Sequence, residues 1–202
     1  DVTAILKKHV STQFRDGIFL DVGCGSGFLS KLVLRNRFAR SAIGVDISDA
    51  QIKLYNQSVT DGKGIRCDAS NLSMYEKETF QLIGGYSVLH HFFDWFTLLF
   101  ELERVLQKGG LMYFDFEPNA NFQKLFRIPV KIRRSLSNKH QKKNREIESI
   151  AEYHNNFKPG INIEHLKSFI EPRFKLLEIG TRYPDNLSGK LAKFLTFSVK
   201  SV

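Results

Sequence analysis

The chain has 202 residues, of which 42% are hydrophobic and 25% are charged, a balance typical of a globular protein with one sizeable core. No stretch approaches the roughly 20 consecutive apolar residues that span a bilayer, and the first residues lack the pattern of a secretory signal. Cys24 and Cys67 are the two cysteines and form no CxxC or metal-type cluster, which favours a reducing, cytoplasmic setting. Composition therefore excludes membrane-spanning and disulfide-rich classes and predicts one domain over residues 1–202.

The net charge of +9 is concentrated in one segment. Residues 119–145 contain nine lysines and arginines and no acidic residue, whereas the remaining basic residues equal the 21 acidic ones in number. The excess positive charge is therefore a local feature of this segment and not a property of the whole fold.

Hydrophobic periodicity predicts alternating strands and helices along the chain. The order is helix 2–10, strand 17–22, helix 26–37, strand 41–46, helix 48–56 with Ser48 as its N-cap, strand 64–68, strand 80–89, helix 95–106 stopped by Lys-Gly-Gly at 108–110, strand 111–116, helix 162–170, strand 174–179 and strand 194–199. This alternation predicts an α/β fold in which helices cover both faces of a largely parallel sheet. Ligands of such folds bind beyond the carboxyl ends of the strands. The last two strands, joined by a loop alone, predict an antiparallel hairpin at one edge.

Three glycines occupy alternate positions in the stretch FLDVGCGSGFLS, which runs from Phe19 to Ser30. Glycine adopts the backbone angles of a tight turn cheaply and lets a ligand approach the backbone. The helix that follows offers unpaired N–H groups and a partial positive charge at its N-terminus. Gly23, Gly25 and Gly27 therefore predict a platform for a ligand that carries a carboxylate or phosphate, in preference to a plain strand-to-helix corner.

Two aspartates extend this pattern. Asp46 closes the second predicted strand, where a carboxylate can accept both hydroxyls of a ribose. Asp68 closes the third, where it can accept from the exocyclic amine of an adenine. A nicotinamide-dependent oxidoreductase is the alternative, but its GxGxxG/A pattern has Ser30 at the final position here, and Asp68 would have no role.

These motifs resemble the class I S-adenosylmethionine-dependent methyltransferases of the small-molecule, ubiquinone-biosynthesis-like type. LDVGCGSG resembles the family's glycine motif, GVDIS its ribose-binding strand end and CDAS its adenine-binding strand end. SVLHHF and ELERVLQKGG are similar to the family's fourth strand and to the helix before its fifth. The resemblance is close over residues 17–118 and looser over 153–179. It implies a Rossmann-like, doubly wound seven-stranded sheet, mostly parallel with an antiparallel last strand.

The resemblance also implies a set of cofactor-binding residues and the cofactor S-adenosylmethionine, with S-adenosylhomocysteine as product and no metal. Position by position, the resemblance implies that the methionine moiety is held by Asp21 and by the backbone at Gly23, Gly25 and Gly27. It implies that Asp46 binds the ribose and that Ile47 flanks the adenine. It also implies that Asp68 and the Ala69 backbone bind the edge of the adenine, and that Ser87 lies near the sulfonium.

Three histidines are candidates for catalysis. Methyl transfer from a sulfonium needs a base only if the nucleophile begins protonated, and a neutral imidazole can supply that base. His90 and His91 follow the fourth strand at its ligand-facing end, and we expect adjacent side chains to diverge so that only one enters the site. His154, beside Tyr153, aligns loosely with a family segment that reaches the substrate pocket.

Residues 119–156 are the position where this family often inserts a lid over the substrate. Lysines and arginines alternate with apolar residues at helical spacing there, which predicts an amphipathic helical lid with a basic stripe. The stripe could be a solvated face, clamp an anionic substrate, or rest on an anionic membrane surface beside a lipid-tailed substrate. RNA binding is a further use, but the run NKHQKKNRE has no aromatic residue for base stacking.

The sequence thus predicts a cytoplasmic methyltransferase that acts on an O, N or C atom of a small, anionic or lipid-like molecule. If the basic segment rests on a membrane surface, the protein is peripheral to that membrane. Two alternatives remain open at this point. One is a tRNA or rRNA methyltransferase that uses the basic insert, and the other is a cofactor-binding scaffold protein without catalysis. The oligomeric state is not predicted.

Overall fold

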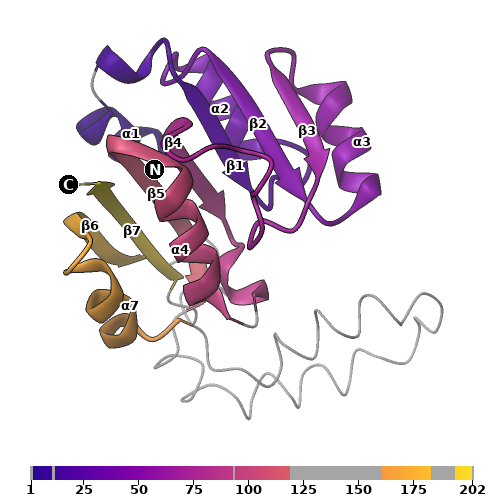
Figure 1. The fold of residues 1–202 in the computed structure, drawn as a ribbon. Helices are drawn as coiled ribbons and strands as arrows, with labels where there is room; N and C mark the ends of the chain where they lie inside the picture. The colour runs from indigo at the N-terminus through magenta and orange to yellow at the C-terminus, as the bar shows by residue number, and fades with distance from the viewer. Residues whose placement is uncertain (1, 11, 93, 119–160, 183–193, 202) are drawn as a thin grey trace.

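The computed structural model describes residues 2–10, 12–92, 94–118, 161–182 and 194–201 (Figure 1). The predicted lid at 119–156, with Tyr153 and His154, lies outside the described residues. Within the described ranges the elements follow the predicted alternation of strand and helix.

Seven strands form one sheet in the order β3-β2-β1-β4-β5-β7-β6. Their bounds are β1 Ile18–Val22, β2 Ser41–Asp46, β3 Gly62–Arg66, β4 Phe80–Tyr86, β5 Leu106–Pro118, β6 Phe174–Arg182 and β7 Phe194–Ser201. β1 to β5 pair in parallel, while β7 pairs antiparallel with both β5 and β6. The predicted Rossmann-like sheet with an antiparallel last strand is confirmed, with β6 forming the outer edge and β7 lying between it and β5.

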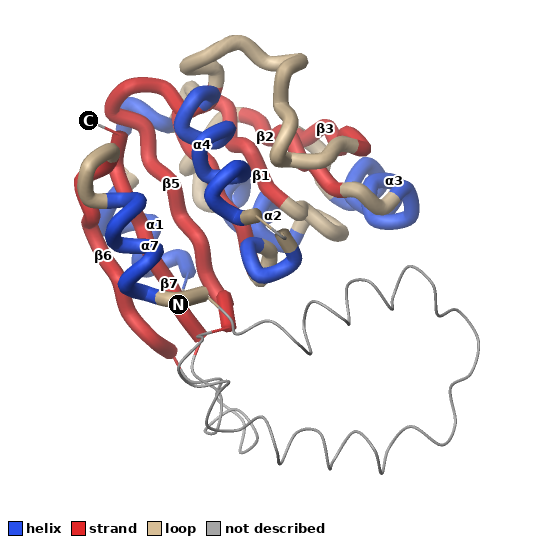
Figure 2. The backbone as a smooth tube through the Cα atoms, turned by 60° about the horizontal axis from the view of Figure 1, so that its bottom comes forward, coloured by secondary structure: helices blue, strands red, loops and turns tan. Residues whose placement is uncertain are grey.

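Helices cover both faces of this sheet. They are α1 Val2–His9, α2 Phe28–Arg35, α3 Asp49–Ser58, α4 Trp95–Val105 and α7 Ile163–Ile170, with short 3-10 turns η1 Thr12–Phe14 and η2 Leu89–His91. α4 and α7 bury their apolar sides in one cluster, and α1 and α2 pack into a second one with Phe19 and Tyr113. Figure 2 shows α4 and α7 on the same side of the strands.

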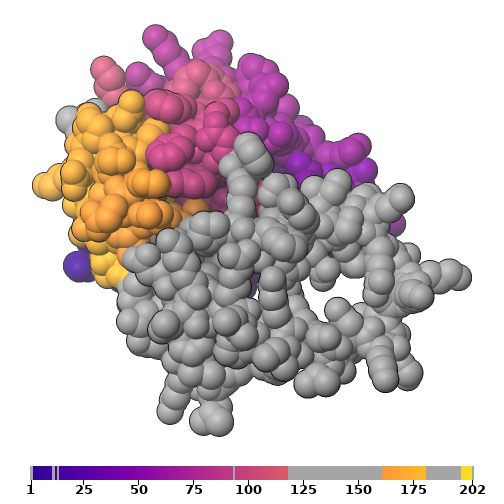
Figure 3. Space-filling view, turned by 90° about the horizontal axis from the view of Figure 1, so that it is seen from below, coloured from indigo at the N-terminus to yellow at the C-terminus, as the bar shows by residue number. Residues whose placement is uncertain are grey.

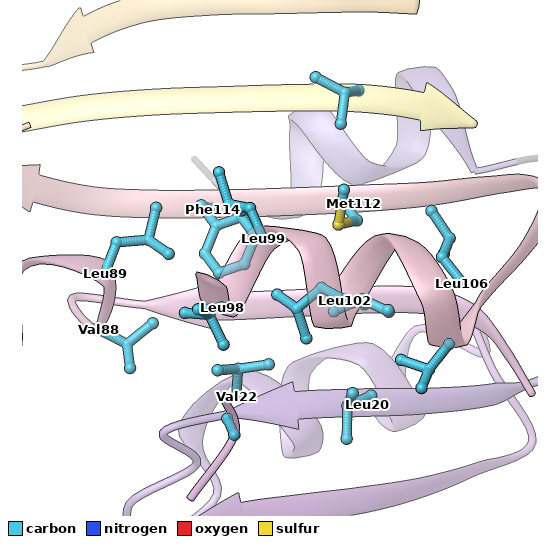
Figure 4. Packing of buried hydrophobic residues seen from close by; sticks show 14 of the residues in the cluster. Leu20, Val22, Val88, Leu89, Leu98, Leu99, Leu102, Leu106, Met112 and Phe114 are labelled. Carbon is cyan, nitrogen blue, oxygen red and sulfur yellow. The ribbon is translucent and has the colours of Figure 1, made fainter. Parts of the chain in front are cut away.

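The larger cluster owes its composition to the alternation of side chains along each strand. Leu20 and Val22 of β1 point to the same face, where they meet Leu98 and Leu102 of α4 (Figure 4). Phe19, which directly precedes Leu20, belongs to the cluster on the opposite face. Two-sided burial of this kind is what makes the central strands read as continuous apolar runs.

α4 and α7 also contact each other at the surface. The Phe100 and Phe169 rings meet edge to face with centroids 4.9 Å apart, and the Arg173 guanidinium lies 4.7 Å from the Phe169 centroid. Figure 3 shows the orange surface of residues 161–182 lying against the magenta surface of α4. Residues 161–182 are thus packed onto the same body as the first half of the chain.

Several element boundaries differ from the sequence prediction. The fourth strand, predicted over 80–89, ends at Tyr86, and Leu89 belongs to η2. The third strand ends at Arg66, so Asp68 lies beyond the strand in a turn. The fifth strand begins at Leu106 and runs through Lys-Gly-Gly, because Leu106 already pairs with Phe80 of β4. The register shifts across the paired glycines, since the next pair is Leu111 with Leu82, and Gly109 has a positive φ of 71°. The glycines thus form an irregularity within the strand and do not separate it from Leu106.

Candidate cofactor site at the switch point of the sheet

The strand order reverses between β1 and β4, where the chain leaves the β3 edge and returns to the other side of β1. Val22 is in register with Val45 of β2 on one side and Gly85 of β4 on the other. The residues that follow these three therefore emerge side by side at the carboxyl edge. A strand-order reversal is where ligands of open α/β sheets bind.

The glycine loop occupies this position with backbone angles that suit glycine. Gly23, Gly25 and Gly27 all have positive φ, at 59°, 49° and 85°. A Cβ placed on Gly23 would lie 2.2 Å from Cγ2 of Val88, which follows β4. A Cβ on Gly25 would meet only Oε1 of Gln51, at 3.8 Å. Gly23 thus makes room for β4, whereas the backbone at Gly25 is open to a ligand.

Asp46 ends β2 and holds the glycine loop. Its Oδ2 accepts a hydrogen bond from the Gly25 N–H at 3.0 Å, and its Oδ1 accepts from the Ser48 N–H at 2.9 Å. Each carboxylate oxygen can accept a second hydrogen bond, and Asp46 is only partly buried. The carboxylate therefore has capacity for two further donors, such as the hydroxyls of a ribose.

Asp21 lies beneath the loop, with an exposed fraction of 2%. Its Oδ2 accepts from the backbone N–H of Ser30 at 3.0 Å and from the Ser30 hydroxyl at 2.7 Å, and that hydroxyl contacts the Tyr55 hydroxyl at 2.8 Å. Gly27, the N-cap of α2, has no side chain to satisfy the first turn of the helix, so Asp21 takes over that task. Burial raises the pKa of Asp21 to about 7, against the opposing effect of the Ser30 hydrogen bonds.

The residues predicted to contact adenine lie at the ends of β2 and β3. Asp68 is exposed, and its Oδ1 accepts from the backbone N–H and the hydroxyl of Ser70, at 2.9 and 2.6 Å. Ala69 is buried beside it, whereas Ile47 is 69% exposed after Asp46. An exposed isoleucine next to a ribose-binding carboxylate offers an apolar face for a flat ring.

Ser87, His90 and His91 follow β4. Ser87 has a positive φ of 58° and its N–H donates to the Asp115 carbonyl at 2.8 Å. The His90 and His91 rings do not diverge as expected from the sequence, since their centroids lie 4.1 Å apart within the tight turn η2. Partial desolvation of its ring, followed by the repulsion of His90, lowers the pKa of His91, although the residue as a whole is exposed.

Glu117 is a site residue that the sequence analysis missed. It lies near the end of β5, has no exposed surface, and accepts four hydrogen bonds from residues 88–90. Its signal in the sequence is an acidic residue at the end of an apolar strand, as at Asp21 and Asp46. Asp115, two residues earlier, is buried as well and accepts from the Tyr113 hydroxyl at 2.6 Å.

The described residues contain neither a metal-type cluster nor a helix that could span a membrane. Among them, no group of three or more histidine, cysteine, aspartate or glutamate side chains is arranged to hold a metal ion. No helix in these ranges combines the length and apolar character needed to cross a membrane.

The sequence and the fold were compared with those of known proteins. The sequence profile of the family described as "Methyltransferase domain" matches residues 20–114, which run from β1 to β5. The crystal structure of an S-adenosylmethionine-dependent methyltransferase from Methanosarcina mazei has the same fold, with a TM-score of 0.68 at 20% identity, and the match covers 98% of this chain and 97% of that one. Just under half of the chain, from β1 to β5, thus has the sequence pattern of a methyltransferase domain, and the fold is that of the S-adenosylmethionine-dependent methyltransferases. The family match decides against the nicotinamide-dependent alternative.

Relatives with assigned functions share the methyltransferase domain over different lengths. A ubiquinone biosynthesis O-methyltransferase of Parvibaculum lavamentivorans is 33% identical over 103 residues, which is 50% of this chain and 40% of that protein. A malonyl-[acyl-carrier protein] O-methyltransferase of Ilyobacter polytropus is 25% identical over 190 residues, which is 88% of this chain and 65% of that protein. The chain thus spans well under half of the ubiquinone relative and about two thirds of the malonyl relative.

A second similar structure was solved with ligands. Geranyl diphosphate C-methyltransferase from Streptomyces coelicolor, in complex with Mg²⁺, geranyl diphosphate and S-adenosyl-L-homocysteine, has a TM-score of 0.69 at 15% identity. The match covers 100% of this chain and 77% of that one. At this identity the likeness establishes that the methyltransferase fold is shared.

Proposed function

We propose that this chain binds S-adenosylmethionine at the glycine loop and transfers its methyl group to an O, N or C atom of a small, anionic or lipid-like molecule. The observation that carries the proposal is the open backbone of Gly25 beside the Asp46 carboxylate, at the switch point of the sheet. A glycine platform next to a strand-end carboxylate with unused acceptor capacity fits an adenosine with a polar tail.

The residues at this edge fit the donor in a definite order. The Gly23–Gly27 backbone and the N-terminus of α2, fixed by Asp21, would hold the methionine carboxylate and amine. Asp46 would accept the ribose hydroxyls, and Ile47 with Asp68 and Ala69 would flank the adenine. Ser87 would then lie beside the sulfur, since β4 is the neighbour of β1.

The chemistry of such a site depends mainly on positioning. S-adenosylmethionine supplies a methyl group on a positively charged sulfur that a nucleophile displaces in line, so orientation and exclusion of water account for much of the catalysis. This chain's part is to fix the loop, keep water out with the apolar residues around Val88, and accept a proton where the nucleophile carries one. His90 or His91, in the turn η2 after β4, would do the last of these.

The substrate class rests on the relatives and on charge. The relatives include proteins named for ubiquinone biosynthesis, for malonyl-[acyl-carrier protein] and for phthiotriol dimycocerosates, and one structural neighbour was solved with geranyl diphosphate. All these names denote lipid-like or anionic molecules. The nine basic residues of 119–145 would attract such a substrate or an anionic membrane that holds it.

Radiolabelled donor tests the proposal directly. The protein is first titrated with S-adenosylmethionine and S-adenosylhomocysteine by calorimetry, and then incubated with [methyl-³H]S-adenosylmethionine and cell extract. Separation into lipid, small-molecule, protein and RNA pools shows where the label goes. We expect binding of both compounds and label in the lipid or small-molecule pool.

The other outcomes point to the alternatives. Label in RNA, with a steep dependence on salt, would replace the small-molecule proposal by tRNA or rRNA methylation. Binding without transfer to any pool would favour a cofactor-binding scaffold protein. Absence of donor binding would contradict the proposal as a whole.

A further inference from the structure

Glu117 binds the turn that carries the two histidines. Its Oε1 accepts from the backbone N–H groups of Val88 and Leu89, at 2.7 and 3.0 Å. Its Oε2 accepts from the backbone N–H of His90 at 3.2 Å and contacts His90 Nδ1 at 2.8 Å. The side chain of Glu117 has no exposed surface. A buried carboxylate is costly unless it is fully hydrogen-bonded, and here each oxygen receives two donors.

Three of these four bonds can be explained by local structure alone. Val88, Leu89 and His90 begin the 3-10 turn η2, whose first N–H groups have no partner within the turn. A carboxylate at that end acts as a cap. The contact with the His90 ring is not part of capping, and at 2.8 Å it is shorter than two of the three backbone bonds.

The ring contact determines which nitrogen of His90 carries hydrogen. Because the Glu117 oxygens accept, Nδ1 must donate, and in a neutral imidazole the other nitrogen, Nε2, then has a lone pair. The His90 side chain is 11% exposed, while its partner is fully buried. Nε2, separated from Nδ1 by the ring carbon Cε1, is the ring nitrogen that is not bound to Glu117.

The same turn adjoins the methyl-donor site. Val88 lies so close to the glycine loop that a Cβ on Gly23 would come within 2.2 Å of its Cγ2. The Asp46 carboxylate is near enough to the next histidine to act on the pKa of His91 through its charge. His90, two residues after Val88, is thus held at the border between the donor loop and the space in front of β4.

We propose that Glu117 is a positioning residue that keeps His90 in the tautomer with a bare Nε2, and that this nitrogen is the base for a protonated acceptor. The inference rests on the proposed function. As the acceptor O–H or N–H bond breaks, its proton goes to Nε2, and its electron pair forms the bond to the methyl carbon. The carbon–sulfur bond breaks and its electrons stay on sulfur, while the Glu117 carboxylate stabilises the imidazolium. The pair of Glu117 and His90 therefore predicts a substrate in which the atom that accepts the methyl group belongs to a hydroxyl or an amine.

The tautomer is measured without any substrate. Long-range ¹H–¹⁵N correlation spectra of histidine-labelled protein at about pH 8, where a neutral imidazole dominates, show which ring nitrogen carries hydrogen. His90→Gln assigns the signals among the six histidines. We expect hydrogen on Nδ1 of His90 in the unmodified protein. In Glu117→Gln the amide NH₂ can donate to Nδ1, so we expect the hydrogen to move to Nε2.

A matched control is available in the same chain. Glu178 contacts the His9 ring at Nε2, 3.2 Å away, far from the site on β6. Glu178→Gln should leave the His90 signals unchanged. Hydrogen on Nε2 of His90 in the unmodified protein would overturn the proposal, and this spectrum decides even if Glu117→Gln fails to fold. An unchanged tautomer in folded Glu117→Gln would overturn it as well.

The rate at which labelled methyl groups are transferred distinguishes a positioning role of Glu117 from a role in capping alone. With [methyl-³H]S-adenosylmethionine and the extract pool that accepts label, Glu117→Gln and His90→Gln should each slow transfer about 100-fold or more. The Kd for S-adenosylmethionine should stay within about threefold, and the double variant should be no slower than His90→Gln. Full transfer by Glu117→Gln would overturn the proposal. If the unmodified protein binds no donor and transfers no label, the proposed function fails, while the tautomer spectrum still tests the pair of Glu117 and His90.

Discussion

The candidate site has two sides that use carboxylates differently. On the donor side, formed by the carboxyl ends of β1 and β2, Asp46 is partly buried and accepts one backbone hydrogen bond on each oxygen. On the acceptor side, formed by the ends of β4 and β5, Glu117 is fully buried and accepts two hydrogen bonds on each oxygen. A carboxylate with remaining capacity suits a ligand, whereas a saturated one suits the task of holding other residues.

One close contact between the two sides lies at Gly23 and Val88. Val88 also donates its N–H to Glu117, so the saturated carboxylate supports the wall against which the donor loop lies. A change on either side should therefore reveal whether the two sides act separately. The following predictions test this, from the largest expected effect to the smallest.

The largest effect is expected where the sides touch. Gly23→Ala adds a methyl group 2.2 Å from Val88 Cγ2 and forces alanine to a φ of 59°. Left-handed backbone and overpacking together should lower the free energy of unfolding by about 2–5 kcal/mol. Gly25→Ala, with 3.8 Å to its nearest neighbour, should cost about 1 kcal/mol by backbone strain alone. Urea denaturation measures both, and equal losses would contradict this view of the contact.

The next effect concerns the donor side alone. Asp46→Ala removes the carboxylate expected to bind the ribose hydroxyls, so it should weaken S-adenosylmethionine binding by about 1.5–3 kcal/mol. Asp49→Ala, which removes an exposed carboxylate paired with Arg66 at 3.4 Å, should leave the affinity unchanged. Calorimetry compares them, and an unaltered Kd in Asp46→Ala would remove that residue from the site.

Asp21 gives the donor side a dependence on pH. Its pKa is raised from 3.8 to about 7 in the folded protein, so folding favours the protonated form. The resulting stability is fully present below about pH 4 and is lost as the pH rises through 7. Relative to Asp21→Asn, the unmodified protein should lose on the order of 2 kcal/mol between these values. If the free energies of unfolding of the two proteins change with pH in the same way, burial of Asp21 has no such effect.

The smallest effect is expected far from the donor loop. Asn162 caps α7 by accepting from the backbone N–H groups of Glu164 and His165, at 2.9 and 3.2 Å. Asn162→Ala should cost about 1 kcal/mol of stability and leave the Kd for S-adenosylmethionine unchanged. A weakened Kd would mean that the donor side depends on the packing of α7, contrary to the separation argued above.

The difference between the donor side and the acceptor side also explains which site residues could be predicted from the sequence. Asp46 and the glycines lie within short motifs whose meaning is local, since turn angles and strand ends determine it. Glu117 is recognised only when β5 is placed beside β4, because its partners lie 27 to 29 residues away in the chain. The early start of β5 was missed for a similar reason, since Leu106 is extended by pairing with Phe80. The close approach of the His90 and His91 rings likewise depends on the 3-10 turn that Glu117 binds.

Glu117 has one further neighbour, the strand β7, whose Leu195 is its partner in the antiparallel ladder. Domains fold as units, and Phe197 and Val199 of β7 share one core cluster with Leu20 and Val22 of β1. Both sides of the candidate site are therefore expected to form together, when the sheet receives β7. A chain that ended before β7 would leave this cluster exposed and would lack a stable frame for either side.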